Sequence, residues 1–136
     1  VQGSGPNTSF SGGAGLLSTA NDYARFLQMT LNGGELDGQR ILSRKTIELM
    51  TTDHLGGIPF RDGQGFGLGF FVVTDLGERG ILGSEREYGW GGAYHTTYWV
   101  DPAEELVVVY LTQLIPAQGI DDYSKLRSGI YQVMID

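Results

Sequence analysis

Residues 87–102 combine aromatic side chains with glycines, a combination that suits close binding of a ligand. They read Glu-Tyr-Gly-Trp-Gly-Gly-Ala-Tyr-His-Thr-Thr-Tyr-Trp-Val-Asp-Pro, so aromatic residues and glycines gather in one short segment. Residues 93–100 suit a β-strand, and Gly91 and Gly92 stand where that strand begins. Glycine at such a position often lets a ligand or another backbone come closer than a side chain would permit. A β-bulge or a bend with no ligand would explain the same glycines, and the local sequence leaves both interpretations open.

Other common catalytic patterns are missing from the chain. The nucleophile elbow Gly-x-Ser-x-Gly does not occur, and there is no cysteine to supply a thiolate. His54 and His95 are too far apart in the sequence for the usual spacing of zinc ligands. Glu85 and Glu87 adjoin the glycine-rich segment, but carboxylates are rarely buried, and we expect both to be solvated at the surface. We therefore predict no metal ion and no cofactor.

Composition and charge narrow the class of protein. The chain has 136 residues, of which 40% are hydrophobic and 11% aromatic, as in an ordinary globular domain with a real core. Its net charge is -7 and its 9 basic residues are scattered, which argues against nucleic acid or an anionic membrane surface as a partner. No segment approaches the roughly 20 apolar residues of a membrane-spanning helix. The lack of cysteine fits a cytoplasmic and an exported protein equally well, so the compartment stays open.

Three amphipathic helices are predicted, after an extended lead-in over residues 1–15. The first follows Ser18 as its N-cap and stops at a Gly-Gly pair, with one face made of Ala20, Tyr23, Phe26, Leu27 and Leu31. The second follows Ser43 as its N-cap, with Ile47 and Met50 turned inward. The last begins at a pair of aspartates and has one apolar face made of Tyr123, Leu126, Ile130, Val133 and Met134.

Three strands are predicted between the second and the last helix. Residues 52–65 hold too many glycines and prolines for regular structure, and we expect a surface loop there. Residues 66–73 form the first strand, and a polar turn follows it. Residues 93–100 and 106–111 then form a hairpin. Because residues 106–111 are apolar on both alternating faces, we expect that strand to be central in its sheet.

The order of these elements predicts an α+β fold, in which an antiparallel sheet of three strands has helices packed against it. No linker or internal repeat interrupts residues 16–136, which we treat as one structural unit. Three strands and three helices can hardly cover a strand that is apolar on both faces. We therefore expect cover from elements outside this unit.

The same elements carry a family resemblance. Tyr-Gly-Trp-Gly-Gly-Ala at residues 88–93, with the aromatic strand, Asp-Pro and valine-rich strand that follow, resembles the third motif of the serine hydrolases with the penicillin-binding-protein and class C β-lactamase fold. The lactamases carry Lys-Thr-Gly there and many relatives His-x-Gly. The β-lactamase-like esterases carry Trp-x-Gly, which here is Trp90-Gly91-Gly92. The resemblance extends from Ser11 to the last helix and is strongest to the esterase branch.

This resemblance implies roles for particular residues. The backbone amide of Ala93 would point at the substrate carbonyl oxygen and share an oxyanion hole with the amide of the nucleophile. Gly92 would let the strand approach the acyl group. Trp90 would supply a flat apolar wall and one N–H donor in place of a charge, which favours uncharged esters over β-lactams. The alternative is that Trp90 fills the core and Ala93 pairs within the sheet. The residues implied to line the substrate pocket are Gly91, Tyr94 and His95, of which His95 departs from the small residue expected at its position.

The nucleophile of this family is missing from the chain. Family members use a Ser-x-x-Lys motif and a second motif that carries a tyrosine, and neither occurs here. In the family both motifs lie upstream, so we interpret the chain as the C-terminal third of a larger serine hydrolase and expect it to be inactive by itself. Its partners would be a small ester substrate and the missing N-terminal portion, and the isolated chain would self-associate through its uncovered sheet. The alternatives are a non-catalytic binding module of the same fold, or a β-lactamase or D-amino-acid peptidase parent.

Overall fold

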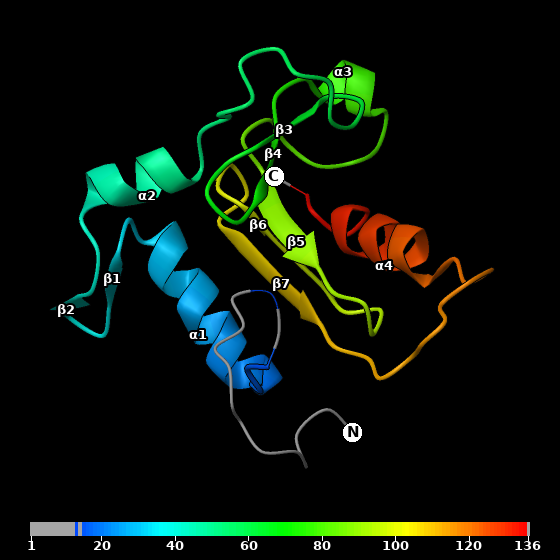
Figure 1. Ribbon diagram of the computed structural model, residues 1–136. Helices are drawn as coiled ribbons and strands as arrows, with labels where there is room; N and C mark the ends of the chain where they lie inside the picture. The colour runs from blue at the N-terminus through cyan, green and yellow to red at the C-terminus, as the bar shows by residue number, and fades with distance from the viewer. Residues whose placement is uncertain (1–12, 14, 136) are drawn as a thin grey trace.

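The computed structural model describes residues 13 and 15–135, so the predicted lead-in over residues 1–15 falls almost wholly outside the described residues. Figure 1 shows the four helices and seven strands that the described residues form. None of these helices, within that part of the chain, is long and apolar enough to cross a membrane. The helices are α1 (Ala20–Leu31), α2 (Arg44–Met50), α3 (Leu76–Arg79) and α4 (Asp122–Tyr131). The strands are β1 (Glu35–Leu36), β2 (Gln39–Arg40), β3 (Gln64–Phe66), β4 (Phe71–Val73), β5 (Tyr88–Gly91), β6 (Thr97–Asp101) and β7 (Leu106–Tyr110).

Five of the strands form one antiparallel sheet in the order β3-β4-β5-β6-β7, so each strand pairs with its neighbour in the chain. Strands β1 and β2 form a separate two-stranded ribbon between α1 and α2. The α+β class and the antiparallel pairing are confirmed. The predicted number of strands is wrong, because the sheet of the described residues has five strands and not three.

One additional strand arises where glycines reverse the chain. The single strand predicted over residues 66–73 is wrong, because the chain turns back between β3 and β4. At this turn Gly69 has φ +94°, a backbone conformation that residues with a side chain rarely adopt. The Gly67 N–H donates to the Phe70 carbonyl at 2.8 Å. The two glycines therefore close a hairpin, which puts β3 beside β4.

The strand predicted over residues 93–100 is also shorter than expected, because its first residues lie in the turn between β5 and β6. Across this turn Gly92 N–H donates to the Thr96 carbonyl at 2.9 Å, and His95 adopts the left-handed backbone conformation with φ +62°. Ala93 therefore lies in a hairpin turn and not on a strand. The residues before the turn, which include Trp90, form β5 and pair with both β4 and β6.

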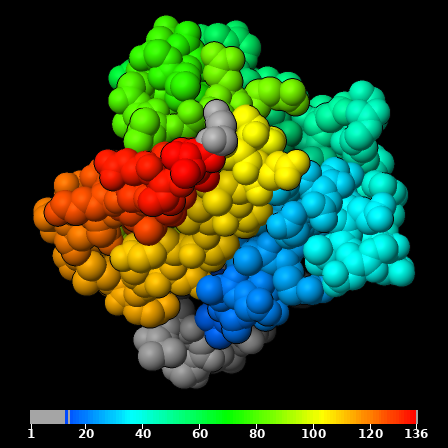
Figure 2. All heavy atoms as spheres, turned by 180° about the vertical axis from the view of Figure 1, so that it is seen from behind, coloured from blue at the N-terminus to red at the C-terminus, as the bar shows by residue number. Residues whose placement is uncertain are grey.

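Helices α1 and α4 pack on opposite faces of the sheet (Figure 1). Side chains alternate along β6, so Tyr98 faces α1, where its ring centroid lies 4.9 Å from that of Tyr23. The next residue, Trp99, faces α4 and donates through Nε1 to Tyr131 OH at 3.2 Å. In Figure 2 the red and orange residues of α4 lie on one side of the yellow strand residues near position 100, and the blue residues of α1 lie on the other side. The buried core on the α1 face consists of Leu27, Phe70, Val72, Tyr88 and Val100.

The ends of two helices differ from the prediction. Thr19 is the N-cap of α1 in place of Ser18, since Thr19 Oγ1 accepts from the Asp22 N–H at 3.1 Å. Ser43 caps α2 as predicted. Helix α4 ends before Val133, which is 75% exposed and so does not belong to the packed face.

Strand β7 lies at the edge of the sheet, whereas its apolar sequence predicts a central strand. Within the described residues β7 pairs only with β6, and all five of its residues are half-buried. Helix α1 covers one face of β7, because Val107 and Val109 pack against the core cluster around Leu27. The second edge of β7 therefore presents backbone groups that no described strand pairs with.

Candidate active site

A cleft of about 400 Å³ lies where the end of β5, the turn after it and the start of α4 come together, a size typical of small-molecule sites. We call residues 92–96 the site turn. Arg61, Phe71 and Tyr123 contribute to the walls. Tyr94 lies outside the lining, and its carbonyl accepts from Thr112 Oγ1 at 2.7 Å. Five of the six site residues implied by the sequence line the cleft, namely Trp90, Gly91, Gly92, Ala93 and His95.

Trp90 lines the cleft and packs in an aromatic cluster with residues behind it. Its ring centroid lies 5.1 Å from that of Phe66 in an edge-to-face contact and 6.4 Å from that of Phe60 in a nearly parallel one. The central guanidinium carbon of Arg61 lies 5.2 Å from the Trp90 ring centroid, which is a cation–π geometry. Trp90 is half-buried and is one of the residues that line the cleft. The wall at Trp90 is apolar with one positive charge beside it, and sequence reasoning missed that charge.

Gly91 and Gly92 lie close to Thr96, across the turn, where a side chain would have little room. A Cβ on Gly91 would lie 2.9 Å from the Thr96 carbonyl oxygen, and a Cβ on Gly92 would lie 2.5 Å from Thr96 Oγ1. Both glycines let the site turn close tightly, which accounts for them without a ligand. A close approach of substrate to Gly92 stays a prediction.

Ala93 is exposed in the site turn. Two other amides of the turn are used within it, since Gly92 N–H donates to the Thr96 carbonyl at 2.9 Å and His95 N–H donates to the Gly92 carbonyl at 3.1 Å. The Ala93 N–H donates to no acceptor among the described residues, so it does not pair within the sheet. A free amide on an ordered turn beside a cleft is the kind of donor that an oxyanion hole requires.

His95 turns its ring toward the start of α4. Its Nε2 lies 2.7 Å from Asp122 Oδ1, and its ring stacks on Tyr123 with 4.1 Å between centroids. The second carboxylate oxygen, Asp122 Oδ2, accepts from Tyr110 OH at 2.9 Å. The hydrogen bond with His95, supported by the one from Tyr110, holds the pKa of the Asp122 carboxyl below its usual range although burial opposes this. Sequence reasoning assigned Asp122 and Tyr123 to the start and the apolar face of the last helix. Those structural roles explain both residue types, so nothing in the sequence marked them as neighbours of the site.

The expectation that Glu87 is solvated is wrong, because its carboxylate is fully buried directly before β5, whereas Glu85 is exposed as expected. Arg127 of α4 donates through Nη1 to Glu87 Oε2 at 2.9 Å, and Arg79 of α3 donates through Nη2 to Oε1 at 2.9 Å. Two cations therefore compensate the buried carboxylate. The cluster ties α3 and α4 to the start of β5, which is the strand that carries Trp90.

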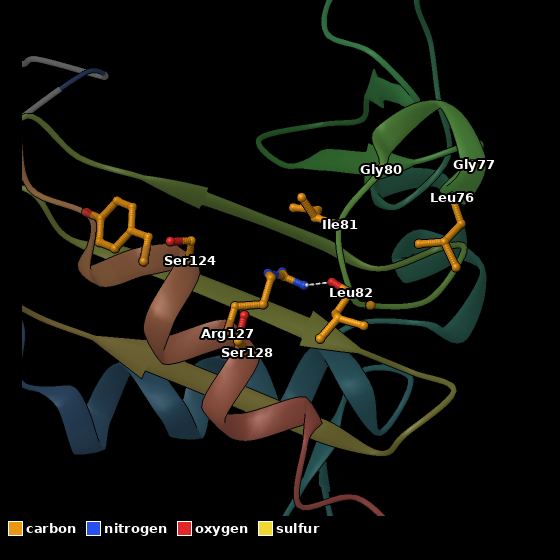
Figure 3. A pocket seen from close by; sticks show the side chains of 10 residues that line it. Leu76, Gly77, Gly80, Ile81, Leu82, Ser124, Arg127 and Ser128 are labelled. Carbon is orange, nitrogen blue, oxygen red and sulfur yellow. Dashed lines mark hydrogen bonds between the residues drawn. The ribbon is translucent and has the colours of Figure 1, made fainter.

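A larger cavity of about 760 Å³ lies between α4 and the segment around α3 (Figure 3). Figure 3 shows Ile81 and Leu82 on one side of it, with Ser124 and Arg127 of α4 on the other. Arg127 donates through Nη1 to the Leu82 carbonyl at 2.7 Å and so joins the two sides. None of the six residues implied by the sequence lines this cavity, so we place the candidate site in the smaller cleft.

Comparison with known proteins gives a family match over most of the chain. A family model described as Beta-lactamase matches residues 1–125. An uncharacterized protein of Mycobacterium tuberculosis is 40% identical to the chain over 128 residues, which cover 85% of this chain and 32% of that protein. A protein of Escherichia coli O157:H7, provisionally named a D-alanyl-D-alanine carboxypeptidase, is 32% identical over 105 residues, which cover 75% of this chain and 23% of that protein.

Solved structures are similar over the same extent. EstCE1, described as a hydrolase with promiscuous acyltransferase activity, matches with a TM-score of 0.67 and 25% identity over 82% of this chain and 29% of its own. A protein from Bacillus anthracis, provisionally named a 6-aminohexanoate-dimer hydrolase, matches with a TM-score of 0.56 and 21% identity over 85% of this chain and 28% of its own, which shows a shared fold. The chain thus spans about a third or less of the length of these proteins.

Proposed function

The chain belongs to the Beta-lactamase family, and we propose that it is the C-terminal portion of a serine hydrolase that cleaves small carboxylic esters through an acyl-enzyme. In this proposal the nucleophilic serine and its base come from the rest of the protein. The observation that carries the proposal is the free Ala93 amide, exposed beside Trp90 in the cleft. The fold similarity to EstCE1, a hydrolase, supports it.

The proposed role of the Ala93 amide follows from where negative charge develops during ester cleavage. Attack of a serine on an ester carbonyl gives a tetrahedral intermediate whose oxygen is negatively charged. The Ala93 N–H would donate to that oxygen together with the amide of the nucleophile, and one such donor contributes about 3 kcal/mol to transition-state stabilisation. The hydrogen bonds donated by the Gly92 and His95 amides hold the backbone of the site turn in place. The Ala93 N–H would therefore need no rearrangement when the negative charge appears. Trp90 would hold the apolar part of the ester.

Arg61 supports a second candidate, a β-lactamase or D-amino-acid peptidase parent that acts on substrates with a carboxylate. Its guanidinium lines the cleft and lies over Trp90, where it could pair with a substrate carboxylate. An E. coli relative bears the name of such a peptidase. The variant Arg61→Gln separates the two candidates. It should lower kcat/KM about 10-fold or more on carboxylate-bearing substrates for a peptidase, but change turnover of neutral esters by less than about 3-fold for an esterase.

The test of the proposed function uses the intact protein that contains this chain. Its upstream sequence should carry Ser-x-x-Lys, the purified protein should hydrolyse a short-chain nitrophenyl ester, and replacement of that serine by alanine should abolish turnover. The isolated chain should match the buffer blank, because turnover requires a nucleophile within about 3 Å of its base and of the oxyanion donors. An intact protein that lacks the motif and turns over no ester or peptide would favour a non-catalytic binding module of the same fold.

A further inference from the structure

One residue of the site turn holds a backbone conformation that most residues avoid. His95 has φ +62°, in the left-handed region that residues other than glycine adopt only at a cost in free energy. Within the turn, two backbone hydrogen bonds join Gly92, His95 and Thr96. The His95 carbonyl also accepts from Thr112 Oγ1 at 2.6 Å. The first two contacts close the turn on itself, and the Thr112 contact ties its backbone to the residues after β7.

The side chain of His95 ties the site turn to a further element, the start of α4. Its Nε2 lies 2.7 Å from Asp122 Oδ1, and only 10% of the His95 side chain is exposed. Asp122 is the first residue of α4, and its second oxygen accepts from Tyr110 OH of β7 at 2.9 Å. One carboxylate thus joins the site turn, a helix and a strand. Because imidazole can carry a proton on Nε2 in its neutral as well as its charged form, the hydrogen bond does not require a charged histidine.

Stacking limits how this contact can move. The His95 and Tyr123 rings lie 4.1 Å apart at an interplanar angle of 7°, so the imidazole lies flat on a residue that also lines the cleft. Tyr123 in turn meets Tyr110 edge to face, with 6.0 Å between centroids. The ring of His95 is therefore held by a directional hydrogen bond and by a stacked neighbour, both from the first turn of α4.

We propose that the His95–Asp122 hydrogen bond, which we call the latch, holds the site turn in place, so that the Ala93 amide keeps its position at the cleft. His95 is then a positioning residue, because it acts on the reaction through the turn and not by touching the reacting atoms. Its effect on turnover rests on the proposed function. The latch itself is a property of the fold and can be measured without substrate.

The experiment compares four single variants and one double variant, His95→Gly with Asp122→Ala, in the intact protein. His95→Gly suits the left-handed backbone but removes the latch, and His95→Gln keeps an N–H donor of similar reach. Asp122→Ala removes the acceptor, and Lys125→Ala, a 77% exposed position on the same helix, is the control. Hydrogen exchange of the peptide that covers the site turn measures the latch, and kcat and KM for a nitrophenyl ester measure its effect on the reaction.

We expect His95→Gly and Asp122→Ala to speed exchange at the site turn and to lower kcat by about 10- to 100-fold with KM changed by less than about 3-fold, since misplacing an oxyanion donor forfeits part of its 100- to 1000-fold effect. The double variant should be no worse than the poorer single variant by more than about 2-fold. His95→Gln should recover at least several-fold in kcat, and Lys125→Ala should match the wild type.

Unchanged exchange in both His95→Gly and Asp122→Ala would overturn the latch, whatever the turnover. Losses that multiply in the double variant would also overturn it, because they would show two independent contributions. If the wild type hydrolyses no ester, the proposed function fails, and faster exchange in the two variants would still support the latch. If His95→Gly does not fold, the comparison of His95→Gln with Asp122→Ala decides by the same two measurements.

Discussion

Glu87 Oε2 and Arg127 Nη1 lie 2.9 Å apart in a buried site between the segment before β5 and helix α4. The Arg127 guanidinium also lies over the Trp99 ring, with 4.4 Å to its centroid. Arg79 approaches the same carboxylate from α3, so one buried anion holds two cations. We expect the stability of the sheet to depend on this cluster, because removing one partner of a buried pair leaves an uncompensated charge.

Replacing Glu87 by glutamine should therefore destabilise the intact protein by about 3 kcal/mol or more, because both arginines then lack their counter-ion. Thermal or urea unfolding followed by circular dichroism measures the loss. The control is Arg25→Ala, which breaks an exposed pair with Asp37 whose side chains are 53% and 66% exposed, and which should cost less than about 1 kcal/mol. Similar losses of stability in the two variants would show that the buried cluster stabilises the fold no more than an exposed ion pair does.

Trp90→Ala should reduce ester turnover of the intact protein more than it reduces stability. The indole is half-buried and lines the cleft, so its loss removes a substrate wall while the core around Leu27 remains. Turnover and melting temperature, measured on the same preparation, separate the two effects. A protein that unfolds but whose folded fraction turns over ester normally would assign Trp90 to the core.

Trp90→Lys tests the substrate preference. A lysine would place a second positive charge near Arg61 and should shift the preference from neutral esters toward carboxylate-bearing β-lactams. The ratio of kcat/KM for the two substrate classes is the measurement. An unchanged ratio would count against the idea that the indole selects uncharged esters.

Asp53, which accepts a hydrogen bond from the Phe66 amide near Trp90, should make the free energy of unfolding depend on pH. Its Oδ1 accepts from the Leu55 and Phe66 amides, both at 3.0 Å, and these two hydrogen bonds hold the pKa of the carboxyl below its usual range. Because the pKa is lower in the folded state, ionised Asp53 stabilises the fold above about pH 4, and this contribution is lost as the pH falls through the folded value. Asp53→Ala should therefore lower the melting temperature at pH 7, and the difference from wild type should shrink at pH 3. An equal difference at both pH values would refute the argument.

The isolated chain should self-associate through β7. One edge of β7 is unpaired within the described residues, and apolar side chains such as Leu111 and Ile115 beyond it are exposed by 43% and 61%. Sedimentation velocity at micromolar concentration should show dimers or larger species. Val108→Lys on the edge strand should reduce them, whereas Leu49→Lys on α2, where Leu49 is 54% exposed, should not. A compact monomer that binds no hydrophobic dye would contradict the prediction.

Local patterns were sufficient to predict the three longer helices but not the number and limits of the strands. The first two helices follow from apolar spacing and caps, and α2 begins after Ser43 as its sequence predicts. The hairpin between β3 and β4 was missed because Gly67 and Gly69 fit a flat strand face as well as a turn. The edge position of β7 was missed because an apolar run indicates burial and does not say which neighbour supplies it.

Residue types and spacings within short segments were enough to predict the α+β class and the family resemblance, and they singled out five of the residues that line the cleft. The burial of Glu87 with Arg127 and the contact of His95 with Asp122 became visible only once the chain was folded, because these partners stand 40 and 27 residues apart. A charged or polar side chain carries no local sign of a distant partner, and its burial becomes favourable only when folding brings that partner within hydrogen-bonding distance.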